Sequence, residues 1–287
     1  MSESVNPAAE SAASNDAAQG APALKTVTSA DGTTIAYQAF GNGAPVILIG
    51  GAFNDRTTML GVAGVLAPRF TGVVYDRRGR GDSTDNAKDG ADEVEREIED
   101  LAALIGALGD RASLFGHSSG GILALEAVMR GLPVDKVAVY EVPYIPEGSR
   151  PLPPADGFER LKNIVGRGDA DGAATLFLTE QVGVPAPVVE QMRAEGEWAY
   201  LAAQAHSLPY DAALGGPVNK IPSDRLTTIR TPALVINGDR TWDWMQTAAG
   251  IVAQSIPGAQ HRVLPGQDHG VLAFPEELRA ALTEFLA

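Results

Sequence analysis

Short apolar segments without polar alternation are the feature that most limits how this chain can fold. Pro45–Ile49, Ala112–Phe115 and Ala233–Ile236 are continuous apolar runs. Strands have this character when helices cover both faces of their sheet. Between the runs lie segments with helical spacing. The clearest begins near Asp92, and its apolar residues form one stripe: Val94, Ile98, Leu101, Ile105 and Leu108. The alternation predicts a sheet of parallel strands joined by helices.

Further strand-like segments bring the predicted sheet to eight strands. They are Lys25–Ser29, Thr34–Phe40, Gly72–Tyr75, Lys136–Tyr140 and His261–Leu264. Asp31-Gly32 separates the first two and is a hairpin signal, so the sheet should begin with an antiparallel pair. We therefore expect the α/β class, with a mostly parallel eight-stranded sheet flanked by helices.

The strand pattern stops between residues 144 and 228. This region opens with a proline-rich stretch and continues with helical patterns over about 156–167, 170–182 and 186–206. We interpret 144–228 as a helical lid inserted into a core that comprises residues 23–143 and 229–287. Residues 1–22 are rich in Ala, Ser and Asn and have no aromatic residue. Such a segment buries too little apolar surface to offset its ordering entropy, which predicts a disordered tail.

The net charge and the absence of cysteine limit the kinds of molecule that this protein is expected to bind. The chain has 22 Lys and Arg against 36 Asp and Glu, a net charge of −14, and no cysteine. Nucleic acids and anionic membranes attract clustered basic residues, so neither is expected as a partner. No apolar run reaches the roughly 18–20 residues of a membrane span, and no signal-peptide pattern opens the chain. We expect a cytoplasmic protein with a small-molecule substrate and neither a metal nor a cofactor. The sequence leaves a homodimer open.

The segment Gly116–Gly120 (GHSSG) predicts a catalytic nucleophile. It follows an apolar strand and precedes the helical run that starts at Gly121, which is the setting of a G-x-S-x-G turn. Small residues on each side let strand and helix approach closely, and the sharp turn exposes the Ser118 hydroxyl. The amide of Ser119 then lies at a helix N-terminus, where negative charge is stabilised.

Three further segments accompany this turn. Gly50–Phe53 (GGAF) follows an early strand, Tyr75–Ser83 (YDRRGRGDS) follows the next, and Gly266–Gly270 (GQDHG) follows the last. With these motifs, residues 24–287 resemble the α/β-hydrolase family. The resemblance implies an oxyanion hole formed by the amides of Ser119 and Ala52, with Phe53 as the alternative to Ala52. It also places the catalytic histidine in the last of these loops.

The histidines allow few choices for the general base. The chain has four: His117, His206, His261 and His269. His117 is the variable residue of the serine turn, His206 lies in the predicted lid, and His261 lies within a strand. Only His269 lies in a loop after a sheet strand, at the edge that also holds the serine, so we predict it as the base.

The acid of the triad departs from the common family pattern. The family usually has an aspartate after the strand Ala233–Ile236, but Thr241 stands there, with Asp239 and Asp243 out of register. Glu141 follows the strand after the serine helix, and the segment Tyr140–Pro143 resembles one hydrolase branch that places its acid there. We favour Glu141, and Asp239 and Asp243 remain as alternatives.

Aromatic and polar residues near the predicted edge are candidates for substrate contact. They are Phe53, Trp242, Trp244, Met245, His206 and Tyr210. The residues favour a serine hydrolase that cleaves an ester, lactone or thioester of a small apolar substrate through an acyl-enzyme. A C–C bond hydrolase, a cyclase or thioesterase with the same triad, and a ligand-binding protein without activity are the alternatives.

Overall fold

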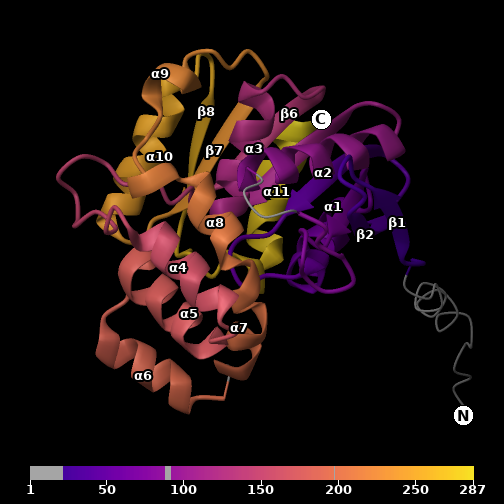
Figure 1. Ribbon diagram of the computed structural model, residues 1–287. Helices are drawn as coiled ribbons and strands as arrows, with labels where there is room; N and C mark the ends of the chain where they lie inside the picture. Colours follow the sequence, from indigo (N-terminus) through magenta and orange to yellow (C-terminus); the bar gives the residue numbers. More distant parts are fainter. Residues whose placement is uncertain (1–21, 88–91, 197) are drawn as a thin grey trace, which may run out of the picture.

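A single eight-stranded sheet forms the centre of the computed structural model, which describes residues 22–87, 92–196 and 198–287 (Figure 1). Most of the predicted tail lies outside the described residues, and Pro22 accepts a hydrogen bond from the Gln38 side chain at 2.7 Å. The strands are β1 (Lys25–Thr28), β2 (Thr34–Phe40), β3 (Ala44–Ile49), β4 (Phe70–Tyr75), β5 (Ala112–His117), β6 (Val134–Tyr140), β7 (Ala233–Gly238) and β8 (Gln260–Leu264). The predicted eight-stranded sheet is confirmed.

The strands lie in the order β1-β2-β4-β3-β5-β6-β7-β8. The pairs β1–β2 and β2–β4 are antiparallel, and the remaining pairs are parallel. The predicted antiparallel start is therefore also confirmed. Parallel pairing brings the carboxyl ends of β3, β5, β6, β7 and β8 to the same edge, and loops at such an edge hold the functional residues of open α/β sheets.

Helices cover both faces of the sheet, and alternate strand residues face the two layers. Ile47 and Ile49 pack with α2 (Glu93–Ala107), α3 (Ser119–Met129) and α10 (Asp243–Ser255). Val46 and Leu48 pack on the other face with α1 (Leu60–Leu66) and α11 (Pro275–Leu286). Because both faces are buried, both sets of alternate positions must be apolar, which explains the continuous runs in the sequence.

A group of helices, which we call the inserted helices, lies between β6 and β7 in the chain. It comprises α4 (Gly157–Gly166), α5 (Ala170–Leu176) with the π-helical turn η2 (Phe177–Val182), α6 (Ala186–Ala194), α7 (Trp198–Gln204), α8 (Leu208–Leu214) and α9 (Ser223–Leu226). Figure 1 shows α4–α7 gathered at one end of the sheet, below it in this view. They have a separate apolar cluster, which includes Leu161, Phe177 and Trp198.

One helical pattern is shorter than predicted. The expected helix over 186–206 is divided into α6 and α7, and Gly196 between them has a φ of 82°. This left-handed conformation favours glycine and ends a helix. Apolar spacing continues across the break because both helices pack on the same cluster.

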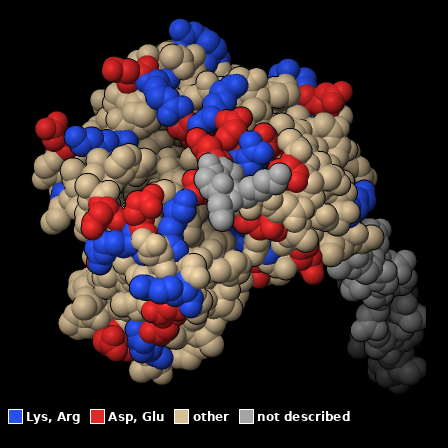
Figure 2. Space-filling model, viewed as in Figure 1, with Lys and Arg blue, Asp and Glu red and all other residues tan. Residues whose placement is uncertain are grey.

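The surface mixes charges of both signs. On the face in Figure 2, Lys and Arg are interspersed with Asp and Glu over the inserted helices and over the core. Within the ranges that the structure describes, no helix has the length and apolar character needed to cross a membrane.

Candidate active site

The serine turn adopts a strained backbone. Ser118, between β5 and α3, has φ 56° and ψ −127°, a region that non-glycine residues rarely occupy. The residues two positions before and two positions after it must be glycine, because there is no space for a side chain. A Cβ on Gly116 would lie 2.3 Å from the carbonyl oxygen of Gly120, and one on Gly120 would lie 2.3 Å from that of Ile49. The turn therefore needs both glycines in order to expose the serine side chain.

A chain of hydrogen bonds connects the serine to a buried carboxylate. The Nε2 of His269 is 3.1 Å from the Oγ of Ser118, and its Nδ1 is 2.8 Å from the Oε2 of Glu141. Residues far apart in the sequence thus meet at the carboxyl edge of the sheet. The arrangement matches the geometry of a nucleophile, a base and an orienting acid.

Glu141 is fully buried directly after β6 and has a φ of 47°. Besides the imidazole, its carboxylate accepts hydrogen bonds from the amide of Gly238 at 2.9 Å and from the hydroxyl of Thr241 at 3.0 Å. Buried carboxylates need such partners. Thr241, which stands where the family usually has its acid, instead donates a hydrogen bond to Glu141. The sequence showed this departure but not the role of the threonine.

Neither alternative acid contacts the imidazole. The Oδ1 of Asp239 accepts a hydrogen bond from the amide of Gly266 at 2.6 Å, and the residue is exposed directly after β7. Asp243 is exposed at the first position of α10. Of the three carboxylates that the sequence left open, the structure brings only Glu141 to His269.

A second imidazole lies beside the first. His117 is buried, its ring centroid is 4.8 Å from that of His269, and its Nε2 donates to the His269 carbonyl oxygen at 2.9 Å. Burial, together with the nearby His269, lowers the pKa of His117 to about 3. His117 is therefore neutral near pH 7, and it supports the loop that carries His269.

The loop after β3 approaches the serine closely. A Cβ on Gly51 would lie 2.9 Å from the Cβ of Ser118, so a larger residue would displace the loop. The side chain of Asn54 fixes this turn by accepting from the Gly51 amide at 3.1 Å. The Ala52 amide donates to no acceptor in the described part of the chain, and Ser119 is the first residue of α3, where amides have no partner within the helix. Both predicted oxyanion donors thus border the space beside Ser118.

A buried network of charges lies on the other side of the serine. Arg77 forms a two-point ion pair with Glu97 and donates to Asp211 at 2.6 Å. Arg80 contacts the other oxygen of Asp211 at 2.6 Å. The Ser119 hydroxyl also donates to Asp211, at 2.7 Å. Burial would raise the pKa of Asp211, but the two arginines outweigh it and lower that pKa.

This network also holds the loop Gly50–Asn54, which carries the predicted oxyanion donor Ala52. Arg80 donates to the carbonyl oxygens of Gly51 and Asn54 at 2.7 and 3.0 Å, and Arg77 reaches that of Gly50 at 3.3 Å. Asp211 belongs to α8, so the inserted helices are connected through it to this loop. The two arginines were noticed in the sequence only as part of a turn motif, and no local signal marked Asp211.

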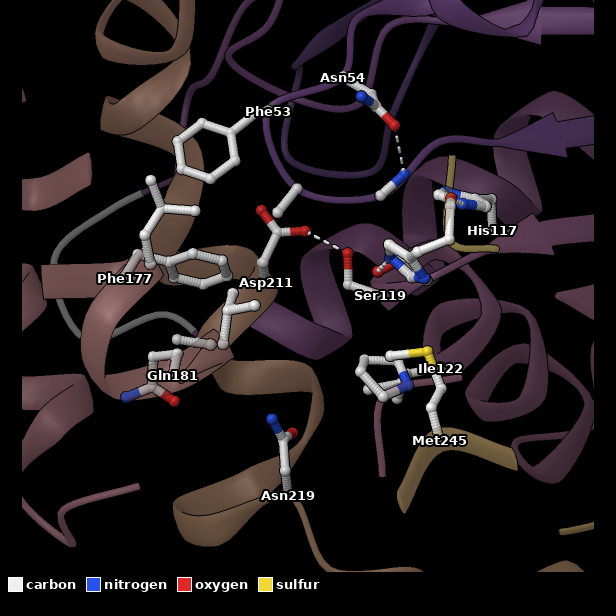
Figure 3. Close-up of a pocket in the computed structure, with 18 of the residues that line it drawn as sticks. Phe53, Asn54, His117, Ser119, Ile122, Phe177, Gln181, Asp211, Asn219 and Met245 are labelled. Atoms are coloured by element: carbon white, nitrogen blue, oxygen red, sulfur yellow. Dashed lines mark hydrogen bonds between the residues drawn. The ribbon is translucent and has the colours of Figure 1, made fainter. Parts of the chain in front are cut away.

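A cavity of about 270 Å³ opens between the sheet edge and the inserted helices (Figure 3). Four of the predicted contact residues line it, namely Phe53, Trp242, Trp244 and Met245. Ser118, Ser119, Ala52 and His269 border the same space. Phe53 also meets Phe177 of the inserted helices edge-on, with ring centroids 5.6 Å apart. The walls are mainly apolar, as in most small-molecule sites.

Two predicted contact residues, His206 and Tyr210, do not line this cavity. His206 bonds through its ring nitrogens to the carbonyl oxygens of Gly79 and Ala203. The Tyr210 hydroxyl donates to Asp85 at 2.7 Å, and its ring packs under Arg78. Both residues tie the inserted helices to the loop after β4. Residue type suggested contact with a ligand, but the orientation of each helix directs these side chains away from the cavity.

The described residues contain no cluster of three or more His, Asp or Glu side chains arranged to hold a metal ion. What the site presents is a hydroxyl, an imidazole, a buried carboxylate and backbone amides. This set can perform nucleophilic and general acid–base chemistry.

Comparison with known proteins places the chain in a family. Residues 46–281 match the Alpha/beta hydrolase family, and the chain belongs to it. An alpha/beta hydrolase from Sphaerobacter thermophilus DSM 20745 is 44% identical and superposes with a TM-score of 0.84, covering 92% of this chain and 100% of that one.

Two other relatives are more distant. The non-heme chloroperoxidase CPO-A1 of Kitasatospora aureofaciens is 29% identical over 287 residues, which covers 90% of this chain and 98% of that protein. A thermophilic esterase from Thermogutta terrifontis shares the fold, with 24% identity, a TM-score of 0.69, and coverage of 92% of this chain and 98% of that one.

Proposed function

We propose that this protein is a serine hydrolase that cleaves a carboxylic ester, lactone or thioester of a small substrate through an acyl-enzyme. The observation that carries the proposal is the continuous chain from Ser118 through His269 to Glu141, with contacts of 3.1 and 2.8 Å, at the edge of a cavity. Among the activities open to this family, hydrolysis is the one that these groups fit best.

In the first half-reaction, the Oγ of Ser118 attacks the acyl carbon while the Nε2 of His269 takes the serine proton. Glu141 holds the ring by accepting from Nδ1 and stabilises the imidazolium. The amides of Ser119 and Ala52 donate to the oxyanion of the tetrahedral intermediate, and Phe53 is the alternative to Ala52. The bond to the leaving oxygen or sulfur then breaks, and His269 gives that atom its proton.

In the second half-reaction, water replaces the leaving group. His269 removes a proton from the water as its oxygen attacks the acyl carbon. The same amides hold the second oxyanion, and the carbon–Oγ bond breaks as the proton returns to Ser118. The products are a carboxylic acid and the regenerated enzyme. No step needs a metal or a redox group.

The cavity supports a small substrate with an apolar part. Its volume of about 270 Å³ lies near the lower end of ligand sites, and Phe53, Phe177 and Met245 contribute apolar walls. We further propose that the inserted helices act as a lid over this site, since α8 contacts the oxyanion region through Asp211.

The decisive experiment combines a covalent probe with an activity screen. A fluorophosphonate should label the wild type and not Ser118→Ala. Esters, lactones and thioesters of short acids are then compared, and Ser118→Ala should lower kcat by about 10⁴-fold or more on any that is cleaved. If the wild type is neither labelled nor active, the protein is a ligand-binding member of the family. If Ser118→Ala keeps full activity, the proposed nucleophile is wrong.

The chloroperoxidase relative suggests a second acceptor for the acyl group. Hydrogen peroxide can attack the same acyl carbon in place of water and release a peracid together with free Ser118. We would therefore repeat the screen with peroxide and measure halide oxidation with and without a carboxylic acid. Peracid formation that exceeds hydrolysis at equal low concentrations of peroxide and ester would favour this function.

A further inference from the structure

Arg150 is the exception among the arginines that the structure describes. It is half-buried, and no carboxylate of the described residues pairs with it. Every other described arginine that is not exposed has a carboxylate partner; these are Arg56, Arg77, Arg78, Arg80, Arg96, Arg193 and Arg262. Burial lowers the pKa of Arg150, and no neighbouring anion opposes the shift. In a chain with 36 acidic residues, a partly buried cation without one needs another explanation.

The position of Arg150 supplies that explanation, because it lines the same cavity as Ser118. A series of ring contacts leads from the base to it. The Trp242 ring lies 6.3 Å from the His269 ring, Trp244 stacks on Trp242 at 6.1 Å, and the guanidinium lies over Trp244 at 4.9 Å. The cation is therefore separated from the reacting groups by a pair of indole rings.

The protein contacts of Arg150 hold the guanidinium without satisfying it. Its Nε donates to the carbonyl oxygen of Pro151 at 3.3 Å, and Nη1 and Nη2 donate to those of Val182 and Gln181 at the end of η2. A guanidinium has five N–H donors, so two remain for a ligand. The carbonyl contacts orient the group but provide no negative charge.

Neighbouring polar side chains add to this region of the cavity. Gln181 and Asn219 line it, and Figure 3 shows them across the cavity from Asn54 and His117. Ile145, five positions before Arg150, donates its amide to the Asn219 carbonyl oxygen at 2.7 Å, which keeps the two segments adjacent.

The other charges that border the cavity are already balanced. Asp211 is paired with Arg77 and Arg80, and His117 is neutral. From these contacts we infer that Arg150 binds a carboxylate of the substrate, so that the natural substrate is a small ester or lactone with a second, free carboxylate at a distance from the scissile bond. The inference rests on the proposed function and specifies its substrate class.

Two matched pairs of esters test the inference, one with the free carboxylate on the acyl side of the ester and one with it on the alcohol side. Mono-4-nitrophenyl glutarate is compared with 4-nitrophenyl pentanoate, and 4-acetoxybutanoate with butyl acetate; each pair differs by a carboxylate in place of a methyl group. We expect the wild type to have a higher kcat/KM for the carboxylate of at least one pair. In Arg150→Ala that kcat/KM should fall about 10- to 100-fold, as expected for a lost hydrogen-bonded charge pair, mainly through KM, while the neutral ester changes little.

Two variants control for charge and for folding. Arg167 is an exposed arginine after α4 with no carboxylate partner among the described residues, and Arg167→Ala should leave both substrates of each pair unaffected. Arg150→Lys keeps the charge and should retain part of the preference. Glutarate should slow fluorophosphonate labelling of the wild type more than that of Arg150→Ala.

Two results would overturn the inference. A wild type that hydrolyses the neutral esters through Ser118 but prefers no carboxylate would leave the proposed function standing and remove this substrate class. Equal losses on both members of a pair in Arg150→Ala would mean that the residue only supports η2. Absence of Ser118-dependent activity on every ester, with no fluorophosphonate labelling, would instead refute the proposed function itself.

Discussion

Two buried polar clusters flank Ser118, and they are built in opposite ways. On one side, His269, Glu141 and His117 form a cluster with one carboxylate and two imidazoles, and its backbone is strained at Glu141. On the other side, Arg77 and Arg80 are balanced by Glu97 and Asp211. The first cluster we call the triad cluster, and the second the ion network.

The difference indicates that the triad cluster serves the reaction and that the ion network supports the surrounding structure. The triad cluster consists of imidazoles and a carboxylate, and its contacts lead to the serine hydroxyl. The ion network has fixed charges, and its contacts lead to backbone carbonyls and to the inserted helices. We therefore expect a change in the triad cluster to lower the rate with little loss of stability, and a change in the ion network to lower stability more than rate.

The largest effect is expected from Glu141→Gln. The amide matches the carboxylate in size but does not fix the tautomer of His269 or stabilise its cation, so kcat should fall by about 10³- to 10⁴-fold. Weaker hydrogen bonds to Gly238 and Thr241 are offset by the lower cost of burying a neutral group, and the free energy of unfolding should change by about 1 kcal/mol. Steady-state kinetics and urea unfolding measure the two quantities.

Asp239→Asn is the matched control, because this carboxylate accepts only from backbone in the described structure and lies outside the triad cluster. It should retain kcat. A loss of activity in Asp239→Asn that Glu141→Gln does not share would reverse the assignment of the acid.

The next largest effect should come from Asp211→Asn. This change leaves Arg77 and Arg80 with Glu97 as their one remaining acidic partner in the network, so a buried cation is uncompensated. Breaking a buried pair in this way costs about 3–5 kcal/mol, and urea unfolding should show a loss of this size. The kcat of the folded protein should fall by less than the roughly 10²-fold that accompanies loss of an oxyanion donor.

Asp171→Asn provides the comparison for this change. Asp171 lies in α5 and pairs with Arg193 at the surface, with half of its side chain exposed. Exposed pairs contribute about 0–1 kcal/mol, so this variant should unfold at nearly the wild-type urea concentration. Equal losses from Asp171→Asn and Asp211→Asn would remove the distinction between the ion network and ordinary surface pairing.

The two clusters also differ in how far the sequence predicted them. Ser118 and His269 follow strands that are evident as apolar runs, and a turn directly after a buried strand is placed by that strand. Glu141 could be favoured for the same reason, but Asp239 follows β7 equally closely. Only the contacts of Glu141 with His269, Gly238 and Thr241 separate the two.

The ion network and Arg150 had no such local signal. Asp211 contacts Ser119 across 92 positions of sequence. Its partners Arg77 and Arg80 were interpreted only as part of a turn motif. Within the inserted helices, residue type alone did not show which side chains face the cavity. Tyr210 and Asp211 are neighbours in α8, yet Tyr210 contacts Asp85 and Asp211 borders the cavity.

The smallest expected effect is a difference between the two clusters in how the free energy of unfolding changes with pH. His117 has a pKa of about 3 when folded and about 6.5 when unfolded. Between these values the unfolded chain binds the additional proton, so this contribution to stability falls as pH decreases, by about 2 kcal/mol from neutral pH to pH 5. In His117→Gln that contribution is absent, and the wild-type advantage in urea should shrink by this amount over the same interval. Asp211 has a lowered pKa and stays ionised there, so the curves of Asp211→Asn and wild type should run parallel. Parallel curves for His117→Gln would show that its imidazole is not held neutral beside the base.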